Sequence, residues 1–405
     1  MYNEQRTDRE LLLAAVTTNA LALKYAPGAF SSDREVVLAA VANSGWALKY
    51  ASVTLQADRE VVLAAVAKDG LAIRHASDAL KADHRVVLVA VAGDGDALAH
   101  ASIALQNDRE VVLAAVTQNG YALQYASDAL KADDEVVLAA VAQNGHALQH
   151  ASTALKADRK VVLAAVANEG ELALFYASDA LRADREVVLV AVAADGNAIR
   201  FASKALQDDR EIVLAAVTKD GCALWYASDA FKADRELVLA AVAQDGHTLE
   251  YASDELKADR EVVLAAVADS GWALQYASPE VQADRNVVLV AVADNGKALQ
   301  FASNHLKADC EVVLTAVAEN GDSDVLALAS TALQTDPYVK SWCDLNPKQR
   351  RWRKLRGRAA AIEICMHWMQ AAAKTAEKRR VDATDAEKEA ELARVFAGDS
   401  SKRVS

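Results

Sequence analysis

The chain has 405 residues, of which 53% are hydrophobic and 5% aromatic, with a formal net charge of −13 and only 4 prolines. So many apolar residues exclude a wholly disordered chain, and so few prolines favour helices built from small side chains. The longest apolar runs, about seven residues, are far shorter than the ~20 that a transmembrane helix needs.

The ends of the chain and its cysteines bear on its location. The first residues, MYNEQRTDRELLL, are polar and charged, so they lack the apolar core of a signal peptide. The four cysteines, Cys222, Cys310, Cys343 and Cys365, are too widely spaced for a metal knuckle or a redox pair. We therefore expect an intracellular, cytoplasmic protein, with the nucleus as the alternative location.

An internal repeat dominates the chain from Asp8 onward. Its consensus is D-R-E-V-V-L-A-A-V-A-x-x-G-x-A-L-x-Y-A-S-x-A-L-K-A, and we number the aspartate as position 1. The spacing is 25 residues, except that the seventh copy has one extra residue and the thirteenth has two. Thirteen copies begin at residues 8, 33, 58, 83, 108, 133, 158, 184, 209, 234, 259, 284 and 309.

The first half of each repeat predicts one helix of about eleven residues. Aspartate at position 1 is a good N-cap, and glutamate at position 3 suits the positive end of the helix dipole. Positions 4–10 are apolar on nearly all sides, as in a helix buried among others. Glycine at position 13 occurs in twelve copies, and we expect it to end the helix in the left-handed conformation.

The second half predicts a shorter helix from position 14. Two prolines set its end, because Pro27 falls at position 20 and Pro279 at position 21 of their copies. We expect the helix to stop near position 19, serine at position 20 to act as a second N-cap, and a last turn to form around A-L-K-A. One continuous, kinked second helix is the alternative.

A single repeat is too small to bury its own apolar residues, so neighbouring copies must stack. The sequence therefore predicts an all-α protein, an α-solenoid of about thirteen 25-residue helical repeats over residues 1–335, with a C-terminal helical cap or tail. Arginine at position 2 and glutamate at position 3, each present in ten copies, predict ladders of charge pairs between neighbouring repeats.

The run DREVVLAAVAQNGHALQYASDALKAD resembles the repeats of the family called domain of unknown function 4116. The resemblance covers about residues 8–335 and recurs in all thirteen copies. It implies an α-helical repeat fold. It implies no activity, and it offers no functional residues to assign to this chain.

Three positions of the repeat are candidates for contacts. Position 18 is Tyr, His or Phe in all copies but the last, and we interpret it as packing between repeats rather than as a base-stacking column. Positions 14 and 17 vary through nearly every class of side chain. They form either a binding surface or an unconstrained solvent-exposed face, and aromatic anchors favour binding. The candidate partner-binding residues are Trp46, Tyr121, Trp225, His247 and Trp272.

The repeats lack recognisable motifs for chemistry. No glycine-rich phosphate loop, HExxH, GxSxG or catalytic dyad occurs in the sequence. His146 and His150 have an i, i+4 spacing but no third ligand nearby in sequence, so we expect no metal site and no cofactor. Residues 1–335 carry a net charge of −19, which disfavours nucleic-acid binding by the repeats.

The remaining residues, 336–405, carry a net charge of +6. Trp352, Leu355, Ala359, Ile362, Met366, Met369 and Ala373 alternate in spacings of three and four, which predicts an amphipathic helix. It could cap the solenoid, which we favour, act as a nuclear-import signal or acidic-partner patch, or bind a membrane surface or a calmodulin-like protein. Its candidate basic patch is Lys348, Arg350, Arg351, Arg353, Lys354, Arg356 and Arg358.

These observations lead to three expectations. Residues 1–335 form the solenoid, residues 336–397 a basic amphipathic helical tail, and residues 398–405 a disordered end. The chain is a non-catalytic scaffold for protein–protein interactions, whose partners and oligomeric state the sequence does not identify. The alternative is a nuclear or nucleic-acid-associated protein that binds through residues 348–358.

Overall fold

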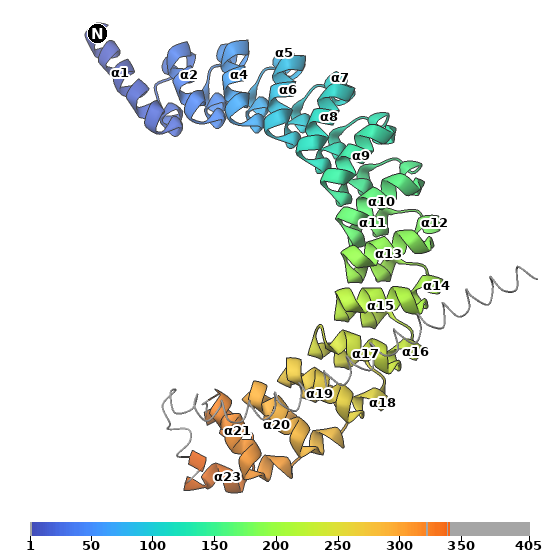
Figure 1. The fold of residues 1–405 in the computed structure, drawn as a ribbon. Helices are drawn as coiled ribbons and strands as arrows, with labels where there is room; N and C mark the ends of the chain where they lie inside the picture. Colours follow the sequence, from blue (N-terminus) through green and yellow to red (C-terminus); the bar gives the residue numbers. More distant parts are fainter. Residues whose placement is uncertain (1, 321–322, 338, 341–405) are drawn as a thin grey trace, which may run out of the picture. The chain divides into compact units, whose positions relative to one another are not determined.

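The structure is a computed structural model that describes residues 2–320, 323–337 and 339–340. The described residues form helices and connecting turns, with no strand among them. They belong to two compact units, Met1–Ser228 and a second that begins at Asp229. In the first unit, the long helices stand side by side along an arc, with short elements such as α5 and α7 on its outer edge (Figure 1). The prediction of an all-α repeat solenoid is confirmed.

Each repeat after the first begins with a helix of about ten residues, close to the expected length. In the first repeat the prediction is wrong, because α1 starts at Tyr2, has 17 residues and runs through Asp8. At α2, the Asp33 carboxylate accepts hydrogen bonds from the backbone N–H groups of Glu35 and Val36 at 3.1 and 3.2 Å, which confirms the predicted N-cap. The thirteen long helices are α1 (Tyr2–Thr18), α2 (Arg34–Asn43), α4 (Arg59–Lys68), α6 (His84–Gly93), α8 (Arg109–Gln118), α9 (Asp134–Gln143), α10 (Arg159–Asn168), α13 (Arg185–Ala194), α15 (Arg210–Lys219), α17 (Arg235–Val242), α19 (Arg260–Asp269), α20 (Arg285–Asp294) and α21 (Cys310–Asn320).

The second element is the predicted shorter helix, and in eleven repeats it is a 3-10 helix. It ends at position 18, so the alternative of one continuous helix through position 20 is wrong. These second elements are η1 (Ala20–Tyr25), η3 (Gly45–Tyr50), η4 (Gly70–His75), η5 (Gly95–His100), η6 (Gly120–Tyr125), η8 (Gly145–His150), α11 (Gly170–Tyr176), η10 (Gly196–Phe201), η11 (Gly221–Tyr226), η12 (Gly246–Tyr251), η13 (Gly271–Tyr276), η15 (Gly296–Phe301) and α22 (Ser323–Leu326).

The third element is a single helical turn, as predicted for the A-L-K-A segment. The serine before it has a role that the sequence did not indicate, because its backbone N–H donates to the preceding repeat: Ser77 to the Gln56 carbonyl and Ser102 to the Lys81 carbonyl, both at 2.9 Å. The third elements are η2 (Phe30–Ser32), α3 (Val53–Gln56), α5 (Asp78–Lys81), α7 (Ile103–Gln106), η7 (Leu130–Ala132), η9 (Leu155–Ala157), α12 (Asp179–Arg182), α14 (Lys204–Gln207), α16 (Asp229–Lys232), α18 (Asp254–Lys257), η14 (Val281–Ala283), η16 (Leu306–Ala308) and α23 (Thr331–Thr335).

Glycine at position 13 does not act as the left-handed helix end that we expected. Gly45, Gly70, Gly95 and six further glycines at this position have no positive φ. The chain turns instead at position 12, where Asp94 is extended with φ −152° and ψ 113°. A Cβ on Gly95 would lie 2.5 Å from the carbonyl oxygen of Ala115 in the next repeat. Glycine is required because the two backbones approach too closely for a side chain.

The core runs between neighbouring repeats. Positions 4, 5, 8, 9, 15 and 16 are buried in nearly every copy, for example Val111, Val112, Ala115 and Val116 on α8. Within each unit, each long helix lies against the long helix of the next repeat and against the adjoining second elements. Burial therefore depends on stacking, as the size of one repeat predicted.

The extra residue of the seventh repeat changes the type of its second helix. α11 has seven residues where a second element usually has six. At about 1.5 Å rise per residue in an α-helix and about 2.0 Å in a 3-10 helix, seven and six residues span nearly the same length. The insertion is thus absorbed within the repeat.

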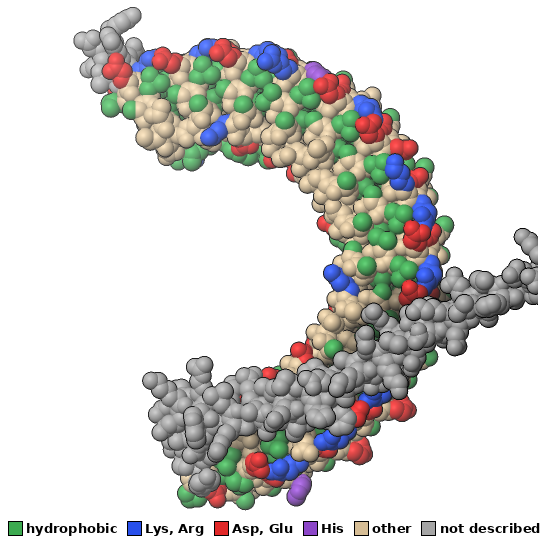
Figure 2. Space-filling model, in the orientation of Figure 1, with side chains coloured by type: hydrophobic (Ala, Val, Ile, Leu, Met, Phe, Trp, Pro, Cys, Tyr) green, Lys and Arg blue, Asp and Glu red, His purple; other side chains and the backbone are tan. Residues whose placement is uncertain are grey.

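A charged edge, made of positions 1–3, runs along the outer rim of the first unit, where red and blue side chains gather (Figure 2). Arg109 donates from Nε to Asp133 at 3.0 Å and also pairs with Glu135. The same pairing joins Arg34 to Asp58 and Glu60 of the following repeat. The predicted ladder of charge pairs is confirmed.

The stack continues briefly beyond the thirteenth copy. The chain is helical at residues 337 and 339–340, and the Asp336 carboxylate accepts a hydrogen bond from the Val339 N–H at 3.1 Å. Val339 is buried, as residues at position 4 are. Asp336 thus starts a further helix in the manner of a position 1 aspartate. The rest of the expected tail lies outside the described residues.

Candidate interaction surface

The second elements present positions 14 and 17 together. A 3-10 helix has three residues per turn, so side chains three apart lie above one another. The residue at position 12 starts this helix: the Asn119 side-chain oxygen accepts a hydrogen bond from the Tyr121 N–H at 3.0 Å. At the other end, the Ala126 N–H donates to the Leu123 carbonyl at 3.1 Å. The geometry places both variable positions on one face of each repeat.

Rings at position 14 contact rings at position 18 of the next repeat. Trp46 meets His75 edge to face with centroids 5.8 Å apart, and Tyr121 meets His150 at 5.1 Å. In the second unit, Trp272 meets Phe301 at 5.5 Å. Edge-to-face rings at these separations attract one another. The interpretation of position 18 as packing between repeats is confirmed.

Positions 14 and 17 also contact one another across neighbouring repeats. The Arg74 guanidinium lies 5.6 Å from the Trp46 ring centroid, and the Arg200 guanidinium is 3.2 Å from the Glu171 carboxylate. The Gln149 side-chain amide donates to the Tyr121 hydroxyl. The side chains at positions 14 and 17 thus differ from repeat to repeat, but those that meet across two repeats match one another. We call positions 14, 17 and 18 together the aromatic column.

One part of the aromatic column is continuous over four repeats of the first unit. Tyr121 contacts His146 at 5.3 Å, His146 stacks on Tyr176 at 5.5 Å, and Tyr176 contacts Phe175 at 4.8 Å. Phe175 then contacts Phe201 at 4.8 Å. We call these five residues the ring chain.

The insertion in α11 adds exposed apolar surface beside the ring chain. Leu172 is 39% and Phe175 46% exposed, although large apolar side chains elsewhere in the repeats are mostly buried. Tyr176 and Phe201 beside them are half-buried, and the Arg200 guanidinium lies 4.4 Å from the Phe201 ring centroid. We call Leu172, Phe175, Tyr176 and Phe201 the apolar patch.

Comparison with protein families adds to this geometry. The family model described as "Domain of unknown function (DUF4116)" matches residues 8–56, 58–106, 85–131, 133–182, 184–232, 234–282 and 284–334. The chain belongs to the DUF4116 family. Each match spans about two of the structural repeats, so the family's unit is a pair of neighbours. No curated protein and no solved structure matches the chain.

The five predicted partner-binding residues of this DUF4116 chain belong to both units, three to the first and two to the second. In the first unit, Trp46, Tyr121 and Trp225 lie on the second, fifth and ninth repeats. Trp225 is 58% and Trp46 38% exposed, whereas Tyr121 is half-buried within the ring chain. They are separate positions along the column.

The other two predicted residues belong to the second unit. His247 is exposed, and its Nε2 lies 3.1 Å from the Ser270 hydroxyl of the next repeat. Trp272 is half-buried against Phe301. The basic patch, Lys348, Arg350, Arg351, Arg353, Lys354, Arg356 and Arg358, lies outside the described residues.

Most of the apolar patch does not coincide with the residues that the sequence predicted for partner binding. Phe175 and the inserted Leu172 are not among the predicted partner-binding residues, and Tyr176 and Phe201 occupy position 18, which the sequence predicts to pack between repeats. The available signal was the 26-residue spacing between Asp158 and Asp184. An extra residue in a tightly fitted repeat must change the local surface, and here it turns two large apolar side chains outward.

Burial shifts three histidines of the column toward the neutral form. It lowers the pKa of His75, His100 and His150 below the ordinary value, and nearby cations act in the same direction. At neutral pH these rings therefore pack as uncharged aromatic groups. His146 and His150 both contact the Tyr121 ring, and no group of three or more metal-ligating side chains occurs in the described part of the chain.

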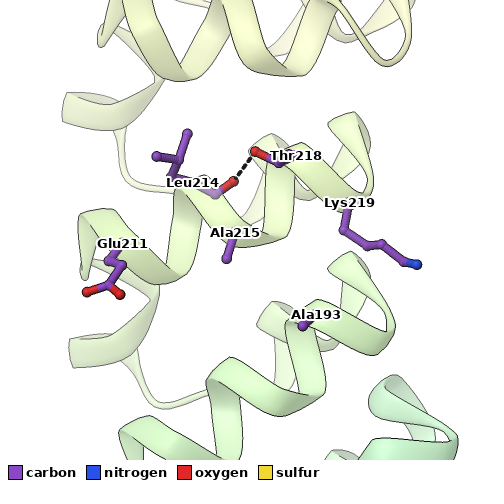
Figure 3. Close-up of a pocket in the computed structure, with 6 residues that line it drawn as sticks. All are labelled: Ala193, Glu211, Leu214, Ala215, Thr218 and Lys219. Atoms are coloured by element: carbon purple, nitrogen blue, oxygen red, sulfur yellow. Dashed lines mark hydrogen bonds between the residues drawn. The ribbon is translucent and has the colours of Figure 1, made fainter. Parts of the chain in front are cut away.

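A shallow depression of about 430 Å³ lies between α13 and α15 (Figure 3). Its lining is mainly the apolar side chains of Ala193, Leu214 and Ala215, and the Thr218 hydroxyl donates to the Leu214 carbonyl at 2.6 Å. The two titratable residues, Glu211 and Lys219, extend to opposite sides of the depression (Figure 3). The depression is an apolar gap between long helices, without converging polar groups.

No helix within the described residues is long and apolar enough to cross a lipid bilayer.

Proposed function

We propose that this chain is a non-catalytic protein-interaction scaffold and that a partner docks on the apolar patch of the seventh and eighth repeats. The observation that carries the proposal is the exposure of Leu172 and Phe175 together on α11. They are three residues apart on an α-helix and so lie on the same side of it. Adjoining exposed apolar side chains of this kind are typical of protein-binding surfaces.

The surroundings of the patch suggest the chemistry of its partner. Tyr176 and Phe201 are held by ring contacts, so they would lose little conformational freedom on binding. Residues 1–335 carry a net charge of −19, which favours neutral or basic partners. We therefore propose a peptide segment with aliphatic or aromatic anchors and few acidic residues.

The remaining parts of the proposal follow from the repeat architecture. The depression between α13 and α15 has the makeup of a packing gap, which supports a non-catalytic role. The exposed thiol of Cys310 fits a reducing, intracellular compartment. Binding of nucleic acid through residues 348–358 stays an alternative, because those residues lie outside the described part of the chain.

A displayed library of random peptides, selected on the intact chain, tests the proposal. Leu172→Ser and Phe175→Ser should each weaken binding of the enriched peptides by at least about tenfold, since anchor contacts dominate such interfaces. Ile103→Ser is the matched control, because Ile103 is 84% exposed but lies on the third element α7. Circular dichroism of each variant monitors its helix content.

Two results would overturn the proposal. One is a set of peptides that binds Leu172→Ser, Phe175→Ser and the intact chain equally well. The other is a loss of binding in Ile103→Ser as large as in Phe175→Ser, which would place the binding surface elsewhere.

A further inference from the structure

The charge of the second elements changes sign along the first unit. Residues 18–25, 43–50 and 68–75, which include η1, η3 and η4 in the blue part of Figure 1, contain four cations and one acid. The corresponding residues 93–100 of the fourth repeat contain two acids and no cation. None of the corresponding segments in the fourth to twelfth repeats has a positive net charge. The first three repeats are thus a basic exception on an acidic array.

The four cations of these segments are exposed and form no ion pair with a described residue. At position 17 of the eighth repeat, by contrast, the Arg200 guanidinium lies 3.2 Å from the Glu171 carboxylate. The one acid among the three segments, Asp69, acts as a cap, because its carboxylate accepts a hydrogen bond from the Leu71 N–H at 3.1 Å. We call the four cations the cationic row: Lys24, Lys49, Lys68 and Arg74.

Aromatic rings lie beside three cations of the row. The Lys49 Nζ is 5.9 Å from the ring centroid of the adjacent Tyr50, and Lys24 makes the same contact with the tyrosine that follows it, at 5.1 Å. The Arg74 guanidinium is 5.6 Å from the ring centroid of Trp46, which is itself 38% exposed. Attraction to a ring limits the motion of a cation before any ligand arrives, so binding costs less conformational entropy.

The neighbouring His75 lies in the electric field of the cationic row. Burial is the main cause that lowers the pKa of His75, and Arg74 and Lys49 are the next causes. The histidine is therefore neutral at neutral pH. The positive charge of this surface comes from the row alone, and no described carboxylate neutralises it.

The cations at position 17 recur once in each repeat. They lie on η1, η3 and η4, and η3 contacts both of the others. Packed helices lie about 8–10 Å apart, so neighbouring cations should be separated by about this distance. A polyproline II peptide rises about 3.1 Å per residue and completes a turn in three residues, which advances it by about 9 Å. Acidic residues at every third position of such a peptide would therefore match one cation per repeat.

We propose that the second elements of the first three repeats bind an extended acidic peptide, whose carboxylates at every third residue pair with Lys24, Lys49 and Arg74. The residues between the acids then contact the exposed part of the Trp46 ring. The proposal does not rest on the apolar patch, which lies on the seventh and eighth repeats and suits a different kind of segment.

The fourth repeat favours a peptide over a nucleic acid. Asp94 and Asp96 follow directly after the cationic row, and the Asp96 N–H donates to the Asp94 carboxylate at 2.9 Å. A nucleic acid carries negative charge along its whole length, so these two acids would repel it where it leaves the row. A peptide can confine its acids to the few residues that face the three cations.

Fluorescence anisotropy with two labelled peptides of identical composition tests the proposal on the full-length chain. The spaced peptide is Glu-Pro-Ser repeated three times, and the clustered peptide has three adjacent glutamates followed by three Pro-Ser pairs. The spaced peptide should bind at least about fivefold more tightly than the clustered one. Raising sodium chloride from 50 mM to 300 mM should weaken its binding by at least about fivefold, because salt screens exposed ion pairs.

Variants of single lysines locate the site. Lys49→Glu should weaken binding of the spaced peptide at least about tenfold, and Lys49→Gln should weaken it less, since glutamate reverses the charge and glutamine only removes it. Lys219→Glu is the matched control, because it makes the same change at an exposed lysine of the ninth repeat and should alter binding by less than about twofold. Circular dichroism monitors the helix content of each variant.

Four results would overturn the proposal. Equal binding of the spaced and clustered peptides would contradict the match between acids and repeats. Binding that Lys49→Glu leaves unchanged would place the peptide on other cations of the chain, such as residues 348–358. Loss of binding in Leu172→Ser would place it on the apolar patch. Tighter binding of a nine-nucleotide single strand of DNA, abolished by Lys49→Glu, would make the ligand a nucleic acid.

Discussion

The charged edge and the aromatic column run along the same repeats, yet one is nearly uniform and the other varies. Both consist of contacts between neighbours. Asp133 is restricted because it caps α9 and also receives Arg109 of the preceding repeat. In the aromatic column, Trp46 contacts the side chains of Arg74 and His75, and its indole, which is a donor only, cannot cap a helix. The difference teaches that a position can vary along this chain although its side chain makes contacts, as long as that side chain does not also cap a helix.

The largest loss of stability should come from protonating the position 1 aspartates of the charged edge together. Nine position 1 aspartates have a pKa below the usual value. The arginine hydrogen bond is the main cause at Asp33, Asp83 and Asp133, and a backbone N–H is the main cause at Asp58 and Asp184. At Asp209, Asp259, Asp284 and Asp309, burial raises the pKa, but arginine and backbone N–H groups outweigh it.

Because these pKa values are lowered by folding, the stability they contribute is present above the unfolded value of about 3.9 and lost as pH falls through the folded values. The melting temperature, followed by circular dichroism, should therefore fall most steeply below about pH 4. Sodium chloride at 1 M and pH 6 should lower it less, since salt screens the ion pairs but leaves the caps. A melting temperature that stays constant from pH 6 to pH 3 would contradict this account.

The next largest loss of stability should come from position 13, where the backbones of neighbouring repeats approach closely. Both the charged edge and the aromatic column depend on this close approach. Gly95→Ala should destabilise the chain by about 2–3 kcal/mol, because its Cβ would lie 2.5 Å from the Ala115 carbonyl oxygen. Gly93→Ala, two residues away, should be neutral or stabilising by up to about 1 kcal/mol, since its Cβ has no atom nearer than 3.7 Å. Urea unfolding measures both variants. Equal changes in the free energy of unfolding of the two variants would show that the close backbone approach does not exclude a side chain at Gly95.

A single aspartate can separate the two roles within the charged edge. Asp133→Ala removes both the cap and the ion pair and should cost about 1–2 kcal/mol. Asp133→Asn keeps a capping oxygen and should cost less, because its exposed partner contributes little. Hydrogen exchange of the α9 amides provides the measurement. If Asp133→Asn were as harmful as Asp133→Ala, the ion pair would be the larger contribution.

The smallest effect should come from the aromatic column. The pKa values of His75, His100 and His150 are lowered in the folded chain, mainly by burial. Their contribution is complete above the unfolded value of about 6.5 and is lost as pH falls toward the folded values. The loss between pH 7 and pH 5.5 should be about 1 kcal/mol or less in total.

Replacing all three histidines by phenylalanine, which occurs at this position as Phe201 and Phe301, should remove that pH dependence. Thermal unfolding at the two pH values checks this. A pH dependence that persists in the triple variant would assign it to groups outside the column.

The sequence predicted the features that depend on neighbours within a repeat. The aspartate caps, the helix over positions 2–11 and the charge ladder follow from local rules and from a strict repeat. It did not predict that the second element is a 3-10 helix, since G-x-A-L-x-Y has no local preference against an α-helix. That choice depends on contacts with the adjoining repeats.

The role of Gly95 and the apolar patch were missed for the same reason. The atoms that exclude a Cβ at Gly95 belong to the next repeat. The exposure of Leu172 and Phe175 follows from how α11 fits between its neighbours. The requirement for glycine at position 13 and the exposure of the apolar patch both depend on the distance between neighbouring repeats. The sequence of a single repeat does not specify that distance.

The hydrogen bond from the position 20 serine to the preceding repeat has a consequence for the gene. The same bond, 2.7–3.0 Å long, joins Ser52, Ser152 and Ser303 to the repeats before them. Unequal exchange between copies of the coding sequence would add or delete about 75 base pairs at a time. Because each of these bonds joins a serine to the repeat directly before it, adding or removing a whole 25-residue copy leaves the bonds at the other junctions in place.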